Sequence, residues 1–326
     1  MPTRRSVPNH ASASTYANEI REQLAAEIAA GTTFNIGPTL PREWRLAKSG
    51  TWPCPIGAVP KSSSTPENTS VRIIVDASHG GSMSLNDRIT TSTAPPDQAP
   101  YLSSQSIAAT LLAAGPTALY SLTDVKSAFQ NIALHPSQYR FSVICFEGNW
   151  HIQTRVGFGF ASSPDLFDTA MGAFDFIQRA KQRPILRIVD DILNFDLPAT
   201  AKANTDSLRA DMAHYGLPRA VAKDVNQQSS IKFNGLLWDA PSLSVSIPPT
   251  RLLSIQACIS AASLARPSLF TIEQVTGKLM SIVCVIIDGK AHLQHLYRAI
   301  NLTTIKFGHR ASPTAVLSRG AREELR

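Results

Sequence analysis

The stretch ILRIVDDILNF, residues 185–195, places two adjacent carboxylates between two short apolar runs. Ile185–Val189 and Ile192–Phe195 are rich in β-branched and aromatic residues, which favour strands. Only Asp190 and Asp191 separate the runs, and a two-residue connection is typical of a tight β-hairpin. We therefore expect both acids at the tip of a hairpin, where two like charges need a compensating cation.

A third carboxylate follows another apolar run. Ala118–Thr123 predicts a strand, and Asp124 comes directly after it. Three such groups suit a hard divalent cation such as Mg²⁺, with water and phosphate as the remaining ligands. Spacing alone leaves a plainer alternative open, because Asp is common in turns and at helix starts. In that alternative, Asp190 and Asp191 form a polar turn and Asp124 is a helix cap.

Four blocks around these acids resemble the reverse transcriptase family, in that family's order. They are SLTDVKSAF (121–129), VGFGFASSPDLF (156–167), RIVDDILNF (187–195) and IKFNGLLWD (231–239). The first two resemble the first two palm blocks, the third resembles the Asp-Asp hairpin, and the fourth resembles the primer grip. Their shared order and spacing make the resemblance specific.

The resemblance extends over about residues 16–300. IGAVPK (56–61) and VRIIVDASHGGSMSLNDRI (71–89) resemble the fingers of retroelement polymerases. EIREQLAAEIAAG (19–31), the SLNDRI string and TIEQVTGKLMSIVCVIIDGKAHLQHLY (271–297) are most similar to the polymerases of DIRS-like tyrosine-recombinase retrotransposons.

The order of predicted elements indicates an α+β fold with antiparallel strands. Apolar periodicity predicts helices over 16–30, 103–114, from 163 onward, and over 199–215, 249–264, 271–287 and 289–300. Strands are predicted at 56–59 and 71–75, with hairpins over 142–154 and 231–247, the latter turning at 239–241. The resemblance implies a right-hand polymerase, with fingers and an antiparallel palm sheet over residues 1–245. A helical thumb and the start of a connection would follow over 246–326.

The resemblance also implies a site for two Mg²⁺ ions, for which Mn²⁺ can substitute. Asp124 would bridge both ions, and the carbonyl of Val125, which is also a dNTP-binding position, would join it. Asp190 would be the second side-chain ligand. Because neighbouring side chains on a strand point to opposite faces, we expect Asp191 to contribute electrostatically or near the primer end.

Five further residues match the family's dNTP-binding positions. Lys61 and Arg72 would hold the β- and γ-phosphates, Arg by a planar fork and Lys as a point charge. Phe129 would leave no room for a ribose 2′-hydroxyl, and Phe158 and Gly159 would form the floor of the pocket. The plainer alternatives are a solvated loop cation for Lys61 and a core ring for Phe129.

Three other residues are assigned by the same resemblance. Lys223 matches a candidate general acid that protonates the departing pyrophosphate, with a surface lysine as the alternative. Phe233 and Gly235 match the primer grip and would position the primer backbone. The candidate thumb cations along a duplex are Lys290, Arg298 and Lys306.

Three positions depart from the family's pattern. Ile188 replaces the aromatic residue before the x-Asp-Asp pair, Gly157 stands where Pro is frequent, and Asn234 replaces an apolar residue of the primer grip. None of them removes a metal ligand, but they put fidelity and processivity in question.

These residues predict an RNA-directed DNA polymerase, a nucleotidyltransferase that extends a primer on an RNA or DNA template with dNTPs. Two alternatives stay open: a relic that binds template and primer without catalysis, and an RNA-dependent RNA polymerase, which Phe129 disfavours. We expect ribonuclease H and recombinase activities on other segments or proteins, because no motif for either occurs. The sequence would then be a fragment of a polyprotein or a degenerate reading frame.

Composition fits a folded protein with a polyanionic partner. The 326 residues carry 31 Lys and Arg against 24 Asp and Glu, a net charge of +7, and 43% are hydrophobic. The longest apolar run, Met280–Ile287, is too short to cross a membrane, and the N-terminus lacks a secretory signal. We therefore expect an intracellular protein.

The four cysteines lie far apart, which predicts small buried side chains rather than zinc or disulfides: Cys54, Cys145, Cys258 and Cys284.

Overall fold

A four-stranded antiparallel sheet brings together strands that lie far apart in the sequence. Its order is β10 (Val225–Gln228), β5 (Leu119–Asp124), β9 (Asp191–Asp196) and β8 (Ile185–Ile188). The pairing of β5 with β9 runs from Leu119 opposite Asp196 to Asp124 opposite Asp191. The ends of β5 and β9 that carry acids therefore meet at one edge of the sheet.

These strands belong to a computed structural model. It describes residues 7–42, 44, 51–61, 70–80, 84–89, 102–263, 266–286, 288–307 and 314–325. The chain folds as the α+β protein that its sequence predicts.

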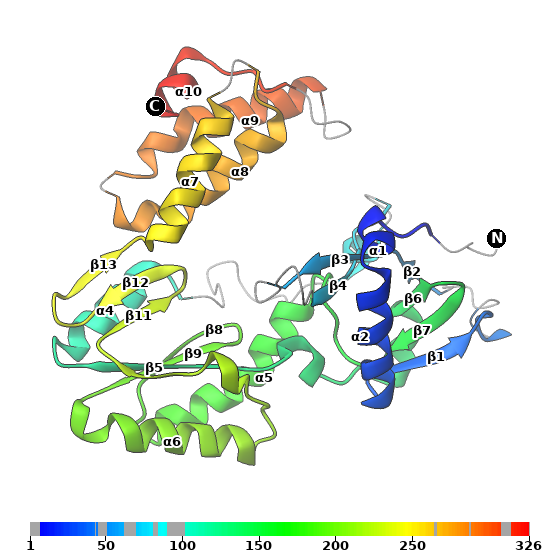
Figure 1. The fold of residues 1–326 in the computed structure, drawn as a ribbon, viewed down its shortest axis with the longest axis horizontal. Helices are drawn as coiled ribbons and strands as arrows, with labels where there is room; N and C mark the ends of the chain where they lie inside the picture. The colour runs from blue at the N-terminus through cyan, green and yellow to red at the C-terminus, as the bar shows by residue number, and fades with distance from the viewer. Residues whose placement is uncertain are drawn as a thin grey trace.

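Both faces of this sheet are buried. Ile192 packs on one face with side chains of α5 (Ser163–Ala180) and α6 (Pro198–His214). Its neighbour Leu193 packs on the other face with α4 (Ser104–Ala114) and the next sheet along the chain. Figure 1 shows α6 and β11 on opposite sides of β5 and β9. Burial on both faces explains the nearly continuous apolar runs of these strands.

The segment predicted as one hairpin over 231–247 is instead a three-stranded sheet. Its strands are β11 (Ser230–Phe233), β12 (Leu236–Asp239) and β13 (Ser244–Ser246). The additional turn is Asn234-Gly235, where both residues have positive φ, 50° and 72°. Asn-Gly with left-handed φ at both positions is the signature of a type I′ hairpin turn. Asn234, which departs from the family's pattern, thus occupies the first position of this turn, where Asn tolerates a left-handed φ.

The N-terminal segment up to β4, together with residues 143–153, forms a second group of helices and strands. A sheet of order β1-β7-β6-β2 lies with the two-stranded β3-β4 ribbon and two helices (Figure 1). The helices are α1 (Ala11–Thr15) and α2 (Ala17–Ala29). The strands are β1 (Thr33–Gly37), β2 (Pro53–Cys54), β3 (Ile56–Pro60), β4 (Val71–Val75), β6 (Val143–Phe146) and β7 (Asn149–Gln153).

The chain after β13 is helical and has its own core. The helices are α7 (Pro249–Ala262), α8 (Leu269–Met280), α9 (Gln294–Phe307) and α10 (Arg319–Glu324). Ile272, Val275 and Leu296 are buried at their centre. The helix predicted over 271–287 ends at Met280, and the one predicted over 289–300 begins at Gln294. Figure 1 shows this group standing beyond β13, apart from the sheets.

Two expectations from composition can be compared with this fold. All four cysteines are free, and Cys54 is buried as predicted, but Cys284 is exposed and its burial was wrongly predicted. Among the helices of the described segments, none is long and apolar enough to span a membrane.

Candidate active site

Three carboxylates meet where β5 and β9 end. Asp124 is the last residue of β5 and lies directly opposite Asp191, the first residue of β9. Directly opposed residues of an antiparallel pair share one face, with Cβ atoms about 5 Å apart. Asp190 precedes β9, and its carbonyl accepts the Val125 N–H at 2.9 Å. The acids thus come from segments 66 positions apart in the sequence, as predicted.

The hairpin between β8 and β9 differs from the prediction by one residue. Its two-residue turn is Val189-Asp190, because Asp191 already pairs with Ile188. Val189 has φ 53°, a left-handed value that is rare for a β-branched residue and occurs mainly where surrounding structure enforces it. The argument from strand alternation therefore does not apply to Asp190, and it is Asp191 that faces Asp124.

Burial and mutual repulsion raise the pKa values of two of these carboxylates. Asp124 is 5% exposed. Burial, and then the charges of Asp190 and Asp124, raise the pKa of Asp191 to about 6. Burial and the charge of Asp124 also raise the pKa of Asp190, against a hydrogen bond from its own backbone and the charges of Lys223 and Arg72. The cluster therefore holds more negative charge than its surroundings neutralise.

Of the three predicted cations, one contacts the carboxylates and a second acts on them through its charge. Lys223 ends the short 3₁₀ segment η5 (Val221–Lys223), and its Nζ lies 2.6 Å from Oδ2 of Asp124. That hydrogen bond raises the pKa of Lys223. Arg72, in β4, acts on Asp190 through its charge. Lys61 follows β3 with an exposed side chain, which forms no ion pair with these carboxylates among the described residues.

The side chains do not already enclose a metal position. Within the described segments, no three His, Cys, Asp or Glu side chains are arranged to hold a metal ion. The ammonium group of Lys223 is the cation in contact with Asp124. A metal held here would require that ammonium to move and the carboxylates to turn toward one another.

Two predicted dNTP-binding rings contact each other in a tilted arrangement. Phe129, in the 3₁₀ segment η3 (Ala128–Asn131), has its ring centroid 5.0 Å from that of Phe158. The guanidinium carbon of Arg72 lies 4.7 Å from the Phe158 centroid, a cation–π contact. Phe129 is only half-buried, so part of its ring packs in the core and part is exposed. The structure thus brings Arg72, Phe158 and Phe129 into one row.

Gly159 is required by a close backbone contact. It has φ +109°, and a Cβ at this position would lie 1.8 Å from the Val75 carbonyl oxygen. No side chain can occupy that space. The loop after β7 therefore presses its backbone against the end of β4, which was not foreseen from the sequence.

The predicted primer-grip residues lie on the three-stranded sheet. The Phe233 ring is 2% exposed and packs in the core, so its backbone alone is available to a ligand. The Gly235 carbonyl accepts a hydrogen bond from Arg251 of α7, whose guanidinium also bonds Ser281. Arg251 thus links this turn to the helical group. No sequence motif marked it, since the contact spans 16 residues between different elements.

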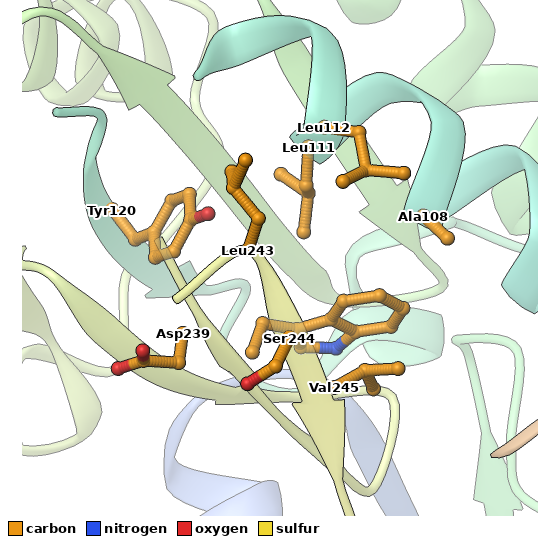
Figure 2. Close-up of a pocket in the computed structure, with 9 residues that line it drawn as sticks. Ala108, Leu111, Leu112, Tyr120, Asp239, Leu243, Ser244 and Val245 are labelled. Carbon is orange, nitrogen blue, oxygen red and sulfur yellow. The ribbon is translucent and has the colours of Figure 1, made fainter. Parts of the chain in front are cut away.

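A pocket lies away from the acids, between α4 and the β12-β13 pair. Figure 2 shows Leu111, Leu112 and Tyr120 facing Leu243 and Val245 across it. None of the predicted site residues lines this pocket. Its walls belong largely to the apolar core.

Known proteins were compared with the sequence and with the fold. No family model matches the sequence, and no curated protein does. The fold is similar to solved structures of a foamy viral protease-reverse transcriptase. Its dRH form in complex with double-stranded DNA is 15% identical with a TM-score of 0.65, covering 99% of this chain and 48% of that one.

Two further structures of that protein agree. The complex with an RNA/DNA hybrid is 16% identical with a TM-score of 0.65, covering 100% of this chain and 38% of the other. The complex with dsDNA is 16% identical with a TM-score of 0.62, covering 100% and 59%. This chain therefore spans 38–59% of the length of those proteins. At this level of identity the likeness concerns the fold alone, which is similar to the fold of these reverse transcriptase structures.

Proposed function

We propose that this chain is an RNA-directed DNA polymerase that extends a primer with dNTPs. The observation that carries the proposal is the cluster of Asp124, Asp190 and Asp191, whose negative charge is incompletely neutralised at the edge of a sheet. Asp190 and Asp191 are half-buried carboxylates with raised pKa values, and groups of this kind cluster at functional sites. The reverse transcriptase fold of the chain supports the same activity.

Asp124, Asp190, Asp191 and the Val125 carbonyl would hold two Mg²⁺ ions, or Mn²⁺ in their place. All four donors are hard oxygens, and the raised pKa values of Asp190 and Asp191 show that further positive charge is favoured there. When bound, Mg²⁺ would lower the energy of the negative charge that develops on the transferred phosphate.

Lys223 would donate a proton to the departing pyrophosphate. Its side chain is 64% exposed although its Nζ contacts buried Asp124, so the ammonium can leave the carboxylate without breaking packing. Its raised pKa keeps Nζ protonated at neutral pH, as a proton donor must be. Lys223 would turn from Asp124 toward the substrate when it donates that proton.

Arg72, Phe158 and Phe129 would receive the nucleotide. Arg72 would bind the triphosphate by its planar fork, and Lys61, at the end of the same β-ribbon, would add a point charge. Phe129 would pack against the sugar and exclude a 2′-hydroxyl, so the substrate would be a dNTP. Gly159 would complete the floor of the site.

The larger parts would serve the template and the primer. Residues 1–245 would be fingers and palm, with β5, β8, β9 and β10 as the palm sheet, and the helices after residue 246 a thumb. Phe233 and Gly235 would hold the primer backbone, and the thumb cations would follow the duplex: Lys290, Arg298 and Lys306. The resemblance of the flanking segments to DIRS-like elements supports an origin in such a retrotransposon.

Primer extension tests the proposal. Purified chain would be given a DNA primer annealed to an RNA template, with Mg²⁺ and either dNTPs or rNTPs. We expect extension with dNTPs, loss of extension in Asp190→Asn, and unchanged extension in Asp206→Asn, an exposed carboxylate on α6. Equal use of dNTPs and rNTPs would contradict the role of Phe129.

The ion pair between Lys223 and Asp124 favours a second candidate, a protein that binds template and primer without extending it. In that case the ammonium would be a permanent partner of the carboxylate. Duplex binding with a steep salt dependence, and no extension by the wild type in Mg²⁺ or Mn²⁺, would support this candidate instead.

A further inference from the structure

We propose that Asn86 is a positioning residue for the nucleotide site, which it organises by fixing the loop of residues 157–162. This inference rests on the proposed function, since it assigns Asn86 a role in dNTP binding. The SLNDRI string that contains Asn86 indicated only a family subgroup in the sequence. The structure shows what its side chain does.

The Asn86 carboxamide joins two segments that lie 73 residues apart. Asn86 begins the 3₁₀ segment η2 (Asn86–Arg88), and its Nδ2 donates to the Gly159 carbonyl at 2.8 Å and to Ser78 Oγ at 2.8 Å. Its Oδ1 accepts the Ala161 N–H at 2.9 Å. One planar group thus binds a carbonyl and an N–H two residues apart on the same loop.

Only a carboxamide makes this pair of contacts. Aspartate offers acceptors alone and would set a charged oxygen against the Gly159 carbonyl, while serine is too short to span both groups. The backbone of Asn86 is itself fixed, because its N–H donates to the Ala77 carbonyl at 3.0 Å. The side chain therefore starts from a defined position on the β4 side of the site.

The loop depends on such contacts because residues 157–162 belong to no helix or strand. A residue of β4 also bonds the loop directly: the Val75 N–H donates to the Phe158 carbonyl at 3.2 Å. The Asn86 contacts follow at residues 159 and 161, just before α5 begins at Ser163. Together they hold the loop backbone on both sides of Gly159.

The consequence falls on the Phe158 ring. That ring contacts both the Arg72 guanidinium, whose carbon lies 4.7 Å from the ring centroid, and the Phe129 ring, whose centroid lies 5.0 Å away. If the loop moves, Arg72 and Phe129 both lose their contact with the Phe158 ring. Arg72 would bind the triphosphate and Phe129 would pack against the sugar, so both functions would be affected. Asn86 would therefore affect nucleotide binding without contacting the nucleotide.

The test compares wild type with Asn86→Asp and Asn86→Ser in primer extension at varied dNTP concentration. We expect KM for dNTP to rise roughly tenfold in both variants, with a smaller change in kcat and unchanged affinity for template and primer. The preference for dNTPs over rNTPs should fall. Asn35→Asp is the matched control: Asn35 is exposed on β1, and its Oδ1 accepts the Gly37 N–H, a contact that Asp keeps.

Hydrogen exchange of peptides spanning residues 157–162 gives a readout independent of turnover. Faster exchange there in Asn86→Ser, with the rest of the chain as protected as in wild type, is the expected result. Wild-type KM in both variants of an active polymerase would overturn this inference alone. A wild-type chain that extends no primer would overturn the proposed function, and the role of Asn86 in dNTP binding with it.

Discussion

Two groups of carboxylates in this molecule differ in how their charge is neutralised. At the edge of the β5-β9 pair, burial and mutual repulsion raise the pKa of Asp191 to about 6. Between α5 and α6, Asp211 is opposed by Lys181 at 2.7 Å and by Arg183 at 2.5 Å. Burial alone would raise the pKa of Asp211. Hydrogen bonds from Lys181, Gln178 and Arg183 outweigh burial and lower this pKa to about 2.

The contrast separates a carboxylate that is neutralised within the fold from a cluster that is not. Asp211 is bound on each side by a donor from the same chain, so its charge stabilises the fold. The three acids at the sheet edge share one ammonium in contact and one more distant guanidinium. Charge left unneutralised in a folded protein is available to a ligand, and the following predictions test that distinction.

The largest expected effect is on activity at the sheet edge. Asp124→Asn should reduce primer extension at least about 1,000-fold, because it removes the acid that faces Asp191 and binds Lys223. Steady-state incorporation rates measure this. The Tm should not fall, since one source of repulsion is removed; a variant that is unfolded would not count as support.

Lys223→Met should reduce the rate roughly 10- to 100-fold, the usual contribution of a general acid. Because the charge of Lys223 lowers the pKa values of Asp190 and Asp191, its removal should move the acidic limb of the pH–rate profile to higher pH. Lys202→Met, which loses an exposed ion pair on α6, is the control. An unshifted profile with an unchanged rate would show that Lys223 is a bystander.

Asp211→Asn should lower the free energy of unfolding at pH 7 by about 1–2 kcal/mol. The pKa of Asp211 is lower in the folded chain than in the unfolded chain, so its stabilising contribution is complete above about pH 4. The difference from wild type should therefore shrink as the pH falls from 4 toward 2. Denaturant unfolding at several pH values measures it, and a variant as stable as wild type at pH 7 would remove the distinction between the two groups.

The smallest effect should have the opposite sign. Asp191→Asn should raise the free energy of unfolding at pH 7, in EDTA, by on the order of 1 kcal/mol. The pKa of Asp191 is higher in the folded chain, so its cost is absent below about pH 4 and grows up to about pH 6. The extra free energy of unfolding of the variant should therefore disappear as the pH falls from about 6 to about 4. A loss of stability at pH 7 would mean that Asp191 is neutralised like Asp211.

Local pattern was sufficient for the strands that carry the acids. The prediction for 71–75 coincides with β4, and Ala118–Thr123 differs from β5 by one residue at each end. It was less reliable at turns. The β8-β9 turn lies at Val189-Asp190, with Val189 in a left-handed conformation. Sequence preference disfavours that conformation for a β-branched residue, and the surrounding tertiary structure enforces it. The Asn-Gly turn at 234–235 carried a strong signal that the resemblance to a primer grip obscured.

The sequence by itself determined which residues could do chemistry: three acids at strand ends, a guanidinium in a short strand, and rings in two family-like blocks. Strand periodicity located the acids, because its pattern repeats over a few residues, and the resemblance to a known family singled out the guanidinium and the rings. Only the tertiary structure decided that Lys223 contacts Asp124 across 99 residues and that Asn86 holds Gly159 across 73. Contacts of that separation depend on strand register and on how the sheets and helices pack, which no local pattern specifies.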